Sequence, residues 1–129
     1  MIPKTHADIL EKKSFAHLAT LMPDGSPQVT PVWVDIADGK VLVNSAKGRL
    51  KDKNLAKDKR VALSATDPDN PYRSVSIRGK VVDIKTEGAD AHIDKMAKKY
   101  MNKDTYPYRR PEEVRVVYKI LPSSTTQMG

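Results

Sequence analysis

The sequence has no cysteine among its 129 residues, and this absence excludes several kinds of chemistry. A chain without cysteine has no disulfide, no thiol nucleophile and no zinc site built on thiolates. Such a chain suits a reducing compartment, so we expect a cytoplasmic location. No segment approaches the roughly 18 consecutive apolar residues of a membrane-spanning helix, and the first residues, MIPKTHADIL, lack the apolar run of a signal peptide. We therefore expect no association with a membrane.

The signature motifs of several enzyme classes are missing as well. The chain has no Gly-x-Ser-x-Gly elbow, no Walker loop and no Gly-x-Gly-x-x-Gly turn. Its three histidines, His6, His17 and His92, fall on separate predicted elements and lack the spacing of a metal site. We expect His6 and His92 on solvated helix surfaces, and His17 packed in a strand or at an interface. The sequence thus assigns no catalytic residue and no metal ligand.

What the chain does have is a concentrated run of positive charge. Between Lys47 and Arg60 lie seven basic and two acidic residues, which carry +5 (seven minus two) of the formal net charge of +7. Such a run suits nucleic acid, a membrane surface, a phosphorylated cofactor or simply water. Aromatic residues make up only 5% of the chain and are not interleaved with this run, which argues against nucleic acid.

The pattern of apolar residues and turns predicts one mainly β (α+β) domain over residues 1–129. Asp-Gly pairs at 24–25 and 38–39 adopt positive φ easily, so they join the first three strands into an antiparallel meander. No parallel βαβ series appears, which argues against a Rossmann sheet. The six predicted strands are Phe15–Leu21, Gln28–Ile36, Val41–Ala46, Arg60–Thr66, Ser74–Thr86 and Val114–Leu121.

Three helices are expected at the openings of the resulting six-stranded antiparallel barrel. A short helix follows Thr5, a suitable N-cap; a second covers Arg49–Asp58; and an apolar stripe at helical spacing predicts the third over Gly88–Met101. In the long fifth strand the apolar phase slips by one residue after Gly79, which predicts a β-bulge. The polar residues 122–129 are expected to form a flexible tail.

The second strand raises a question about the only tryptophan. Alternation places Thr30, Val32 and Val34 on the core face, and Gln28 with Trp33 on the other. A large aromatic side chain there needs a cover, which a partner chain or a flat ligand can provide. A helix packed over Trp33 explains the pattern equally well, so both interpretations stay open.

The start of the predicted second helix has the features of a phosphate site. Ser45, Gly48, Arg49 and Lys51 gather where the third strand leads into this helix. A helix N-terminus offers free N–H groups and a partial positive charge, and arginine can bind phosphate oxygens in a bidentate way. A solvated helix face is the competing interpretation, because charge runs are usually of that kind.

Four segments together resemble one family. They are PDGSPQVTPVW, the pattern GRxKxxNL at Gly48–Leu55, DPDNPYR, and the strand containing RGKV. The chain resembles, from about Leu10 to Leu121, the split-barrel flavin and deazaflavin oxidoreductases of the pyridoxamine 5'-phosphate-oxidase-like superfamily. The best match is the branch that uses the deazaflavin coenzyme F-420.

The resemblance implies a split β-barrel homodimer with a cofactor in each groove at the dimer interface. It implies that Arg49 and Lys51 hold the phosphate, that the ring system lies along Thr30 to Trp33, and that the partner chain contributes around Tyr72 and Arg73. The full set of cofactor contacts implied in this way is Gln28, Thr30, Pro31, Val32, Trp33, Asn44, Ser45, Ala46, Arg49, Leu50, Lys51, Asn54, Tyr72 and Arg73.

The implied activity is hydride transfer between reduced F-420 and an unsaturated small-molecule substrate. Because the cofactor carries that reaction, the missing catalytic motif is no obstacle. Lys47, Lys53 and Lys57 are candidates to meet the anionic tail of F-420. An FMN-dependent oxidase or reductase of the same fold, and a flavin-binding protein without enzymatic activity, remain as alternatives.

Overall fold

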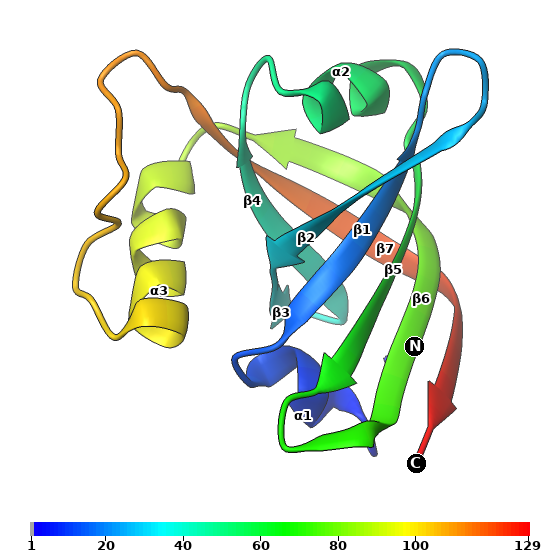
Figure 1. The fold of residues 1–129 in the computed structure, drawn as a ribbon. Helices are drawn as coiled ribbons and strands as arrows, with labels where there is room; N and C mark the ends of the chain where they lie inside the picture. Colours follow the sequence, from blue (N-terminus) through cyan, green and yellow to red (C-terminus); the bar gives the residue numbers. More distant parts are fainter. Residues whose placement is uncertain (1) are drawn as a thin grey trace.

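The computed structural model describes residues 2–129 and contains one antiparallel sheet with three short helices around it (Figure 1). The helices are α1 (Ala7–Glu11), α2 (Leu50–Lys57) and α3 (Ala89–Met101). The strands are β1 (Phe15–Leu21), β2 (Pro27–Trp33), β3 (Asp35–Ala37), β4 (Lys40–Ala46), β5 (Arg60–Asp67), β6 (Asn70–Lys85) and β7 (Arg115–Met128). The sequence therefore predicts the mainly β α+β class correctly.

The sheet has seven strands rather than the predicted six, and it is not closed. Its order is β2-β1-β5-β6-β7-β4-β3, so β2 and β3 are its two edges. These edge strands are consecutive in the chain, and the predicted strand Gln28–Ile36 is divided between them at Val34. Side chains of α3 take the backbone groups there: the Val34 N–H donates to Tyr100 Oη (3.0 Å), and Lys99 Nζ donates to the Val34 carbonyl (2.7 Å). Val34 thus carries the chain from one edge of the sheet to the other.

Alternating apolar residues fill the interior of the curved sheet. On β1, for example, Ala16 and Leu18 are buried while Phe15 and His17 face outward. Tyr118 on β7 is one of the largest fully buried side chains. Burial raises its pKa, and its hydroxyl donates to Asp52 Oδ1 (2.8 Å). This bond ties α2 to the barrel interior.

The long strand β6 contains the irregularity predicted beside Gly79. The pairing of β6 with β7 shifts register between Arg78 and Gly79, and again between Val81 and Asp83. A Cβ atom at Gly79 would stand only 2.2 Å from the Leu121 carbonyl oxygen, so the close approach of the two strands requires glycine.

The last residues of the chain differ from the sequence-based expectation. Instead of a loose tail from Pro122, β7 continues to Met128 and pairs with β6 as far as Ser74↔Met128. A polar strand can hold this position because its backbone bonds, not its side chains, attach it to the sheet. The pairing partner of residues 122–128 is the long strand β6, which is distant in the sequence and therefore cannot be predicted from PSSTTQMG alone.

Helices α1 and α2 lie at opposite ends of the sheet, and α3 lies beside β4 (Figure 1). The N-cap of α1 is His6 and not the expected Thr5, which lies one residue before it. The Thr5 hydroxyl instead forms a hydrogen bond with His6 Nδ1 (2.8 Å). His6 is buried instead of solvated, with Nε2 3.0 Å from the Gly129 carbonyl oxygen. No helix in residues 2–129 combines the length and the apolar character needed to cross a membrane.

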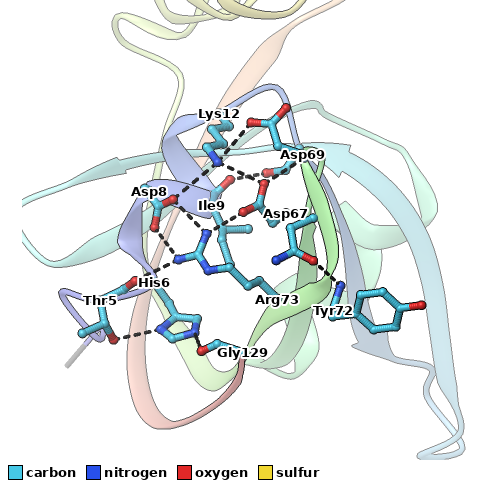
Figure 2. A network of polar contacts seen from close by, with 12 residues as sticks. Thr5, His6, Asp8, Ile9, Lys12, Asp67, Asp69, Tyr72, Arg73 and Gly129 are labelled. Atoms are coloured by element: carbon cyan, nitrogen blue, oxygen red, sulfur yellow. Dashed lines mark hydrogen bonds and ion pairs between the residues drawn. The ribbon is translucent and has the colours of Figure 1, made fainter.

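Ion pairs attach α1 to the hairpin between β5 and β6 (Figure 2). The Arg73 guanidinium bonds to both carboxylate oxygens of Asp8 (3.0 and 3.1 Å) and to Asp67, whose side chain is only 2% exposed. Lys12 joins the same cluster through Asp67 (3.0 Å) and Asp69 (3.1 Å). Arg73 is therefore a structural clamp in this chain.

Candidate functional site

A cavity of about 170 Å³ lies where β2, the start of α2 and the start of β7 meet. Six predicted cofactor residues line it: Pro31, Val32, Trp33, Asn44, Arg49 and Lys51. The remaining lining residues are Phe15, Ile93, Tyr106 and Arg115. A larger cavity of about 500 Å³ shares Arg49 and Tyr106 with it. The structure thus brings these six residues, which come from β2, from β4 and from the start of α2, around one cavity.

Lys51 gives this cavity its electrostatic character. Its side chain is half-buried, and no ion pair joins it to a carboxylate anywhere in residues 2–129. Burial lowers the pKa of Lys51, and the positive charges of Arg49 and Arg115 lower it further. A crowded cation without a counter-ion is stabilised by an incoming anion, so this donor set fits a phosphate.

Arg115 is the deepest of the three cations, with 6% of its surface exposed. Its Nε donates to Asn44 Oδ1 (2.9 Å) and its Nη1 to Glu113 Oε1 (2.8 Å). The guanidinium also lies 5.3 Å from the centre of the Tyr106 ring, at cation–π distance. These contacts fix the guanidinium at the cavity wall.

A chain of hydrogen bonds extends from Arg115 to the surface of α3. Asn44 Nδ2 donates to the Ala89 carbonyl (2.9 Å) and to His92 Nδ1 (3.1 Å), and His92 Nε2 lies 3.1 Å from Asp35 Oδ2. Because Nδ1 must accept here, a neutral ring with its hydrogen on Nε2 fits the contacts. His92 is therefore a positioning residue in a network, not the solvated residue expected from the sequence.

Asp35 is the last residue of this hydrogen-bond network, and its carboxylate is kept ionised. Burial alone would raise the pKa of Asp35, but hydrogen bonds from His92 and Lys95 outweigh burial and lower the pKa to about 2. The Lys95 ammonium lies 3.1 Å from Asp35 Oδ2. The carboxylate thus stays ionised and keeps the His92 ring in place for Asn44.

Trp33 packs under helix α3, which is one of the two interpretations that its sequence pattern allowed. Its ring stacks on Tyr100 of α3, with centres 4.9 Å apart and planes 3° apart, and it meets Tyr106 edge-on at 6.1 Å. Tyr100 Oη in turn donates to the Ser14 carbonyl (2.7 Å). Because Trp33 also lines the cavity, the second interpretation, contact with a flat ligand, is compatible with this packing.

Glu113 lines the larger cavity and bridges two cations of the smaller one. Its Oε1 accepts from Arg115 (2.8 Å) and its Oε2 from Arg49 (3.4 Å). The hydrogen bond from Arg115 lowers the pKa of Glu113, with a smaller effect from Arg49, so the side chain is charged at neutral pH. The site therefore contains its own negative charge.

The other predicted site residues lie elsewhere in this chain. Gln28 lies on the inner face of the sheet, where the buried Thr20 Oγ1 donates to it (3.1 Å), so the alternation placing it on the face of Trp33 is wrong. Asn54 is buried and donates to the same Thr20 hydroxyl (3.0 Å). The remainder do not line the cavity: Ser45 and Ala46 are buried in the sheet, Thr30 is half-buried, Leu50 and Tyr72 are exposed, and Arg73 belongs to the clamp on α1.

Sequence reasoning misses Arg115, Glu113, Ile93 and Phe15. Arg115 begins a strand whose following residues are apolar, and this placement of a charge was the only local signal. Nothing local shows that the loop after α3 returns Tyr106 to the cavity next to the start of α2, because that contact is set by the packing of α3 on the sheet.

Comparison with known proteins identifies the family. A sequence model described as "Pyridoxamine 5'-phosphate oxidase" matches residues 2–129, almost the whole chain. The chain belongs to this family. A comparison with curated protein sequences gave no match.

Solved structures agree with the family. A protein described as "F420 Reductase" has 31% sequence identity, a TM-score of 0.85, and coverage of 97% of this chain and 98% of its own. The conserved hypothetical protein Rv2991 from Mycobacterium tuberculosis has 24% identity, a TM-score of 0.75 and coverage of 99% and 85%. A putative pyridoxamine 5'-phosphate oxidase from Listeria innocua has 18% identity, a TM-score of 0.71 and coverage of 94% and 93%. The last two support the fold alone.

The family assignment confirms the resemblance read from the sequence, including its relation to the F420 branch. At the level of the family, it supports a flavin-type oxidoreductase with a flavin-type cofactor.

Proposed function

We propose that the protein is an oxidoreductase that binds coenzyme F-420 in the cavity around Lys51 and transfers hydride between the reduced cofactor and an unsaturated small molecule. The main support for this proposal is the cavity itself: Arg49, Lys51 and Arg115 converge there beside Trp33, and Lys51 has no acidic partner among residues 2–129. The choice of F-420 over FMN is supported by similarity to the F420 reductase over nearly the whole of both chains.

In this proposal the protein binds and orients the cofactor. Arg49, Lys51 and Arg115 hold phosphate oxygens by charge-assisted hydrogen bonds. The backbone and side chains of Pro31 to Trp33 provide a flat apolar wall for the ring system, and the packing of Trp33 on Tyr100 keeps that wall rigid. The bound cofactor supplies the hydride chemistry, so no acid, base or nucleophile is assigned to the chain.

We also propose that a second copy of the chain covers the outer face of β1 and β2. Phe15 and Val29 are 56% and 59% exposed on this face, and Phe15 also lines the cavity, so a partner seated there would lie next to the cofactor. Tyr72, 79% exposed at the far end of β6, is the residue through which a partner would most readily contribute. Light scattering should give a dimer for the wild type and a monomer for Val29→Glu; a monomeric wild type would contradict this arrangement.

A pair of titrations tests the cofactor. Purified protein is titrated with F-420 and with FMN while the fluorescence of each is followed. We expect saturable binding of F-420 with a lower Kd than that of FMN. Tighter binding of FMN would show that FMN, and not F-420, is the cofactor.

The enzymatic claim needs a separate test, because binding alone also suits a flavin-storage protein. Reduced F-420 and the protein are incubated with a broad panel of unsaturated acceptors, including quinones and enones, and oxidation of the cofactor is followed. Protein-dependent oxidation with at least one acceptor supports the proposal. Tight binding without oxidation by any acceptor would favour a binding protein without enzymatic activity.

A further inference from the structure

Glu113 places a negative charge next to the cations of the proposed phosphate site, from the wall of the adjoining larger cavity. Its two oxygens are divided between Arg115 and Arg49, and its side chain is 18% exposed. Two features hold the Glu113 side chain in place: the residue lies two positions before β7, and its carboxylate is hydrogen-bonded to the buried Arg115. It is a built-in counter-ion.

The charges around the cavity can be counted. Arg49, Lys51 and Arg115 bring three positive charges to the smaller cavity, and Glu113, which pairs with two of them from the wall of the larger cavity, cancels one and leaves two. The larger cavity also contains Arg110, and Arg109, whose charge is paired with Asp90 and Asp94. Asp52, the next carboxylate, is turned away: it accepts from the Gly48 N–H (3.0 Å) and from Tyr118 Oη (2.8 Å) and lines neither of the two cavities. The net charge that meets a ligand thus depends on Glu113.

Phosphate groups differ in the charge that they bring. A phosphomonoester carries about −1.5 to −2 near neutral pH, because its second pKa is about 6. A phosphodiester carries only one negative charge. FMN ends in a monoester, whereas the phosphate of F-420 lies within its side chain as a diester, so the two proposed cofactors differ at the group that this site would hold.

We propose that Glu113 is a specificity-determining residue that reduces the preference of the site for doubly charged phosphomonoesters and thereby favours a phosphodiester. The proposal rests on the proposed function, because it requires the cavity to bind the phosphate of a cofactor. It adds the chemical class of phosphate that the cavity selects and the residue that selects it.

Coulomb's law makes the effect of Glu113 quantitative without knowledge of the local dielectric. The repulsion between the Glu113 carboxylate and a ligand is proportional to the charge of the ligand. Removing that carboxylate therefore changes the binding free energy of a doubly charged ligand by twice as much as that of a singly charged one. If Glu113→Gln strengthens diester binding about threefold, it strengthens monoester binding about ninefold, the square of that gain.

The test uses two ligands with the same ring and different phosphate charge: FMN and the monomethyl ester of its phosphate. Both are titrated by flavin fluorescence at about pH 8 into the wild type, Glu113→Gln, Glu113→Asp and Glu112→Gln. The charge-conserving Glu113→Asp should keep the wild-type ratio of the two affinities. Glu112→Gln removes the same charge from the exposed neighbouring residue and should leave that ratio unchanged.

In Glu113→Gln, and in no other variant, the affinity for FMN should increase by the square of the factor by which the affinity for the ester increases. In the same variant at about pH 5, where the FMN phosphate carries one charge, the two gains should become equal. Equal gains at about pH 8 would overturn the proposal, since they indicate that Glu113 only occupies space. No gain, or the same change in Glu112→Gln, would overturn it too.

Lys51→Ala separates failure of this inference from failure of the proposed function. Loss of a cation that holds phosphate must weaken both ligands. If neither ligand binds saturably, or if Lys51→Ala changes neither affinity, the phosphate site itself is wrong and the proposed function fails with it. If binding depends on Lys51 but the gains in Glu113→Gln are equal, only the role of Glu113 is wrong.

Discussion

Replacing Asp35 by Asn should make the protein less sensitive to acid. Asp35 accepts hydrogen bonds from His92 and Lys95, its side chain is 13% exposed, and its pKa is lowered to about 2 from an ordinary 3.8. The folded state therefore binds the Asp35 proton less readily than the unfolded state does. Its contribution to stability is fully present above about pH 4 and is lost as the pH falls through about 2.

The size of this contribution follows from the pKa difference. The shift from 3.8 to about 2 corresponds to roughly 2.4 kcal/mol at about 1.36 kcal/mol per pH unit. Lys95 is 66% exposed, so solvent screening weakens its share, and we expect about 1 to 1.5 kcal/mol.

Urea unfolding at about pH 6 and about pH 2.5 measures the effect. Between these conditions the wild type should lose about 1 kcal/mol more free energy of unfolding than Asp35→Asn does. Asp104→Asn is the control, because the Asp104 side chain is 95% exposed and its removal should leave the acid sensitivity of the wild type in place. Identical pH dependence in the wild type and Asp35→Asn would refute the ion-pair network.

Three further substitutions test packing and the structural ion pairs through the free energy of unfolding. Gly79→Ala should cost about 2 kcal/mol, because its Cβ would stand 2.2 Å from the Leu121 carbonyl oxygen; an unchanged urea midpoint would contradict the tight bulge. Arg73→Ala should cost about 2 to 3 kcal/mol, because it leaves Lys12 as the only cationic partner of the buried Asp67, beside the Asp69 N–H; a loss below about 0.5 kcal/mol would show that the Arg73 ion pairs contribute little to stability. Tyr100→Phe should cost about 1 to 2 kcal/mol through loss of its hydroxyl bonds, and a neutral result would mean that water replaces them.

The sequence predicts those parts of the fold that depend on local pattern. Strand alternation and Asp-Gly turns identify β1, β2 and β4, and the phase slip after Gly79 identifies the bulge. The division at Val34 and the extension of β7 to Met128 escape such reasoning, because their backbone partners come from distant segments: α3 for Val34, and β6 for residues 122–128.

The candidate site divides in the same way. Arg49 and Lys51 stand out locally as basic residues at a helix start, and both line the cavity. Arg115 belongs to the far end of the chain and reaches the same cavity only through the pairing of β7 with β4, which also brings Glu113, two residues earlier, to the adjoining larger cavity. Strand alternation places Trp33 on the outer face of the sheet but does not show what covers it. The cover is Tyr100 of α3, a helix whose position on the sheet does not follow from its sequence pattern.

If the cavity of Arg49, Lys51 and Arg115 binds the phosphate of F-420, double variants of basic residues inside and outside the cavity must differ in their affinity for F-420. The Kd for F-420 is measured by fluorescence for the wild type, for Arg49→Ala with Lys51→Ala, and for Lys53→Ala with Lys57→Ala. Both double variants remove two positive charges from the same segment, but Lys53 and Lys57 are exposed and lie outside the cavity.

We expect loss of Arg49 and Lys51 to weaken F-420 binding by about 3 kcal/mol, or roughly 100-fold, because charge-assisted hydrogen bonds are lost. Loss of Lys53 and Lys57 should weaken it less than about tenfold, through screened attraction alone. Equal Kd values for the two double variants would contradict the claim.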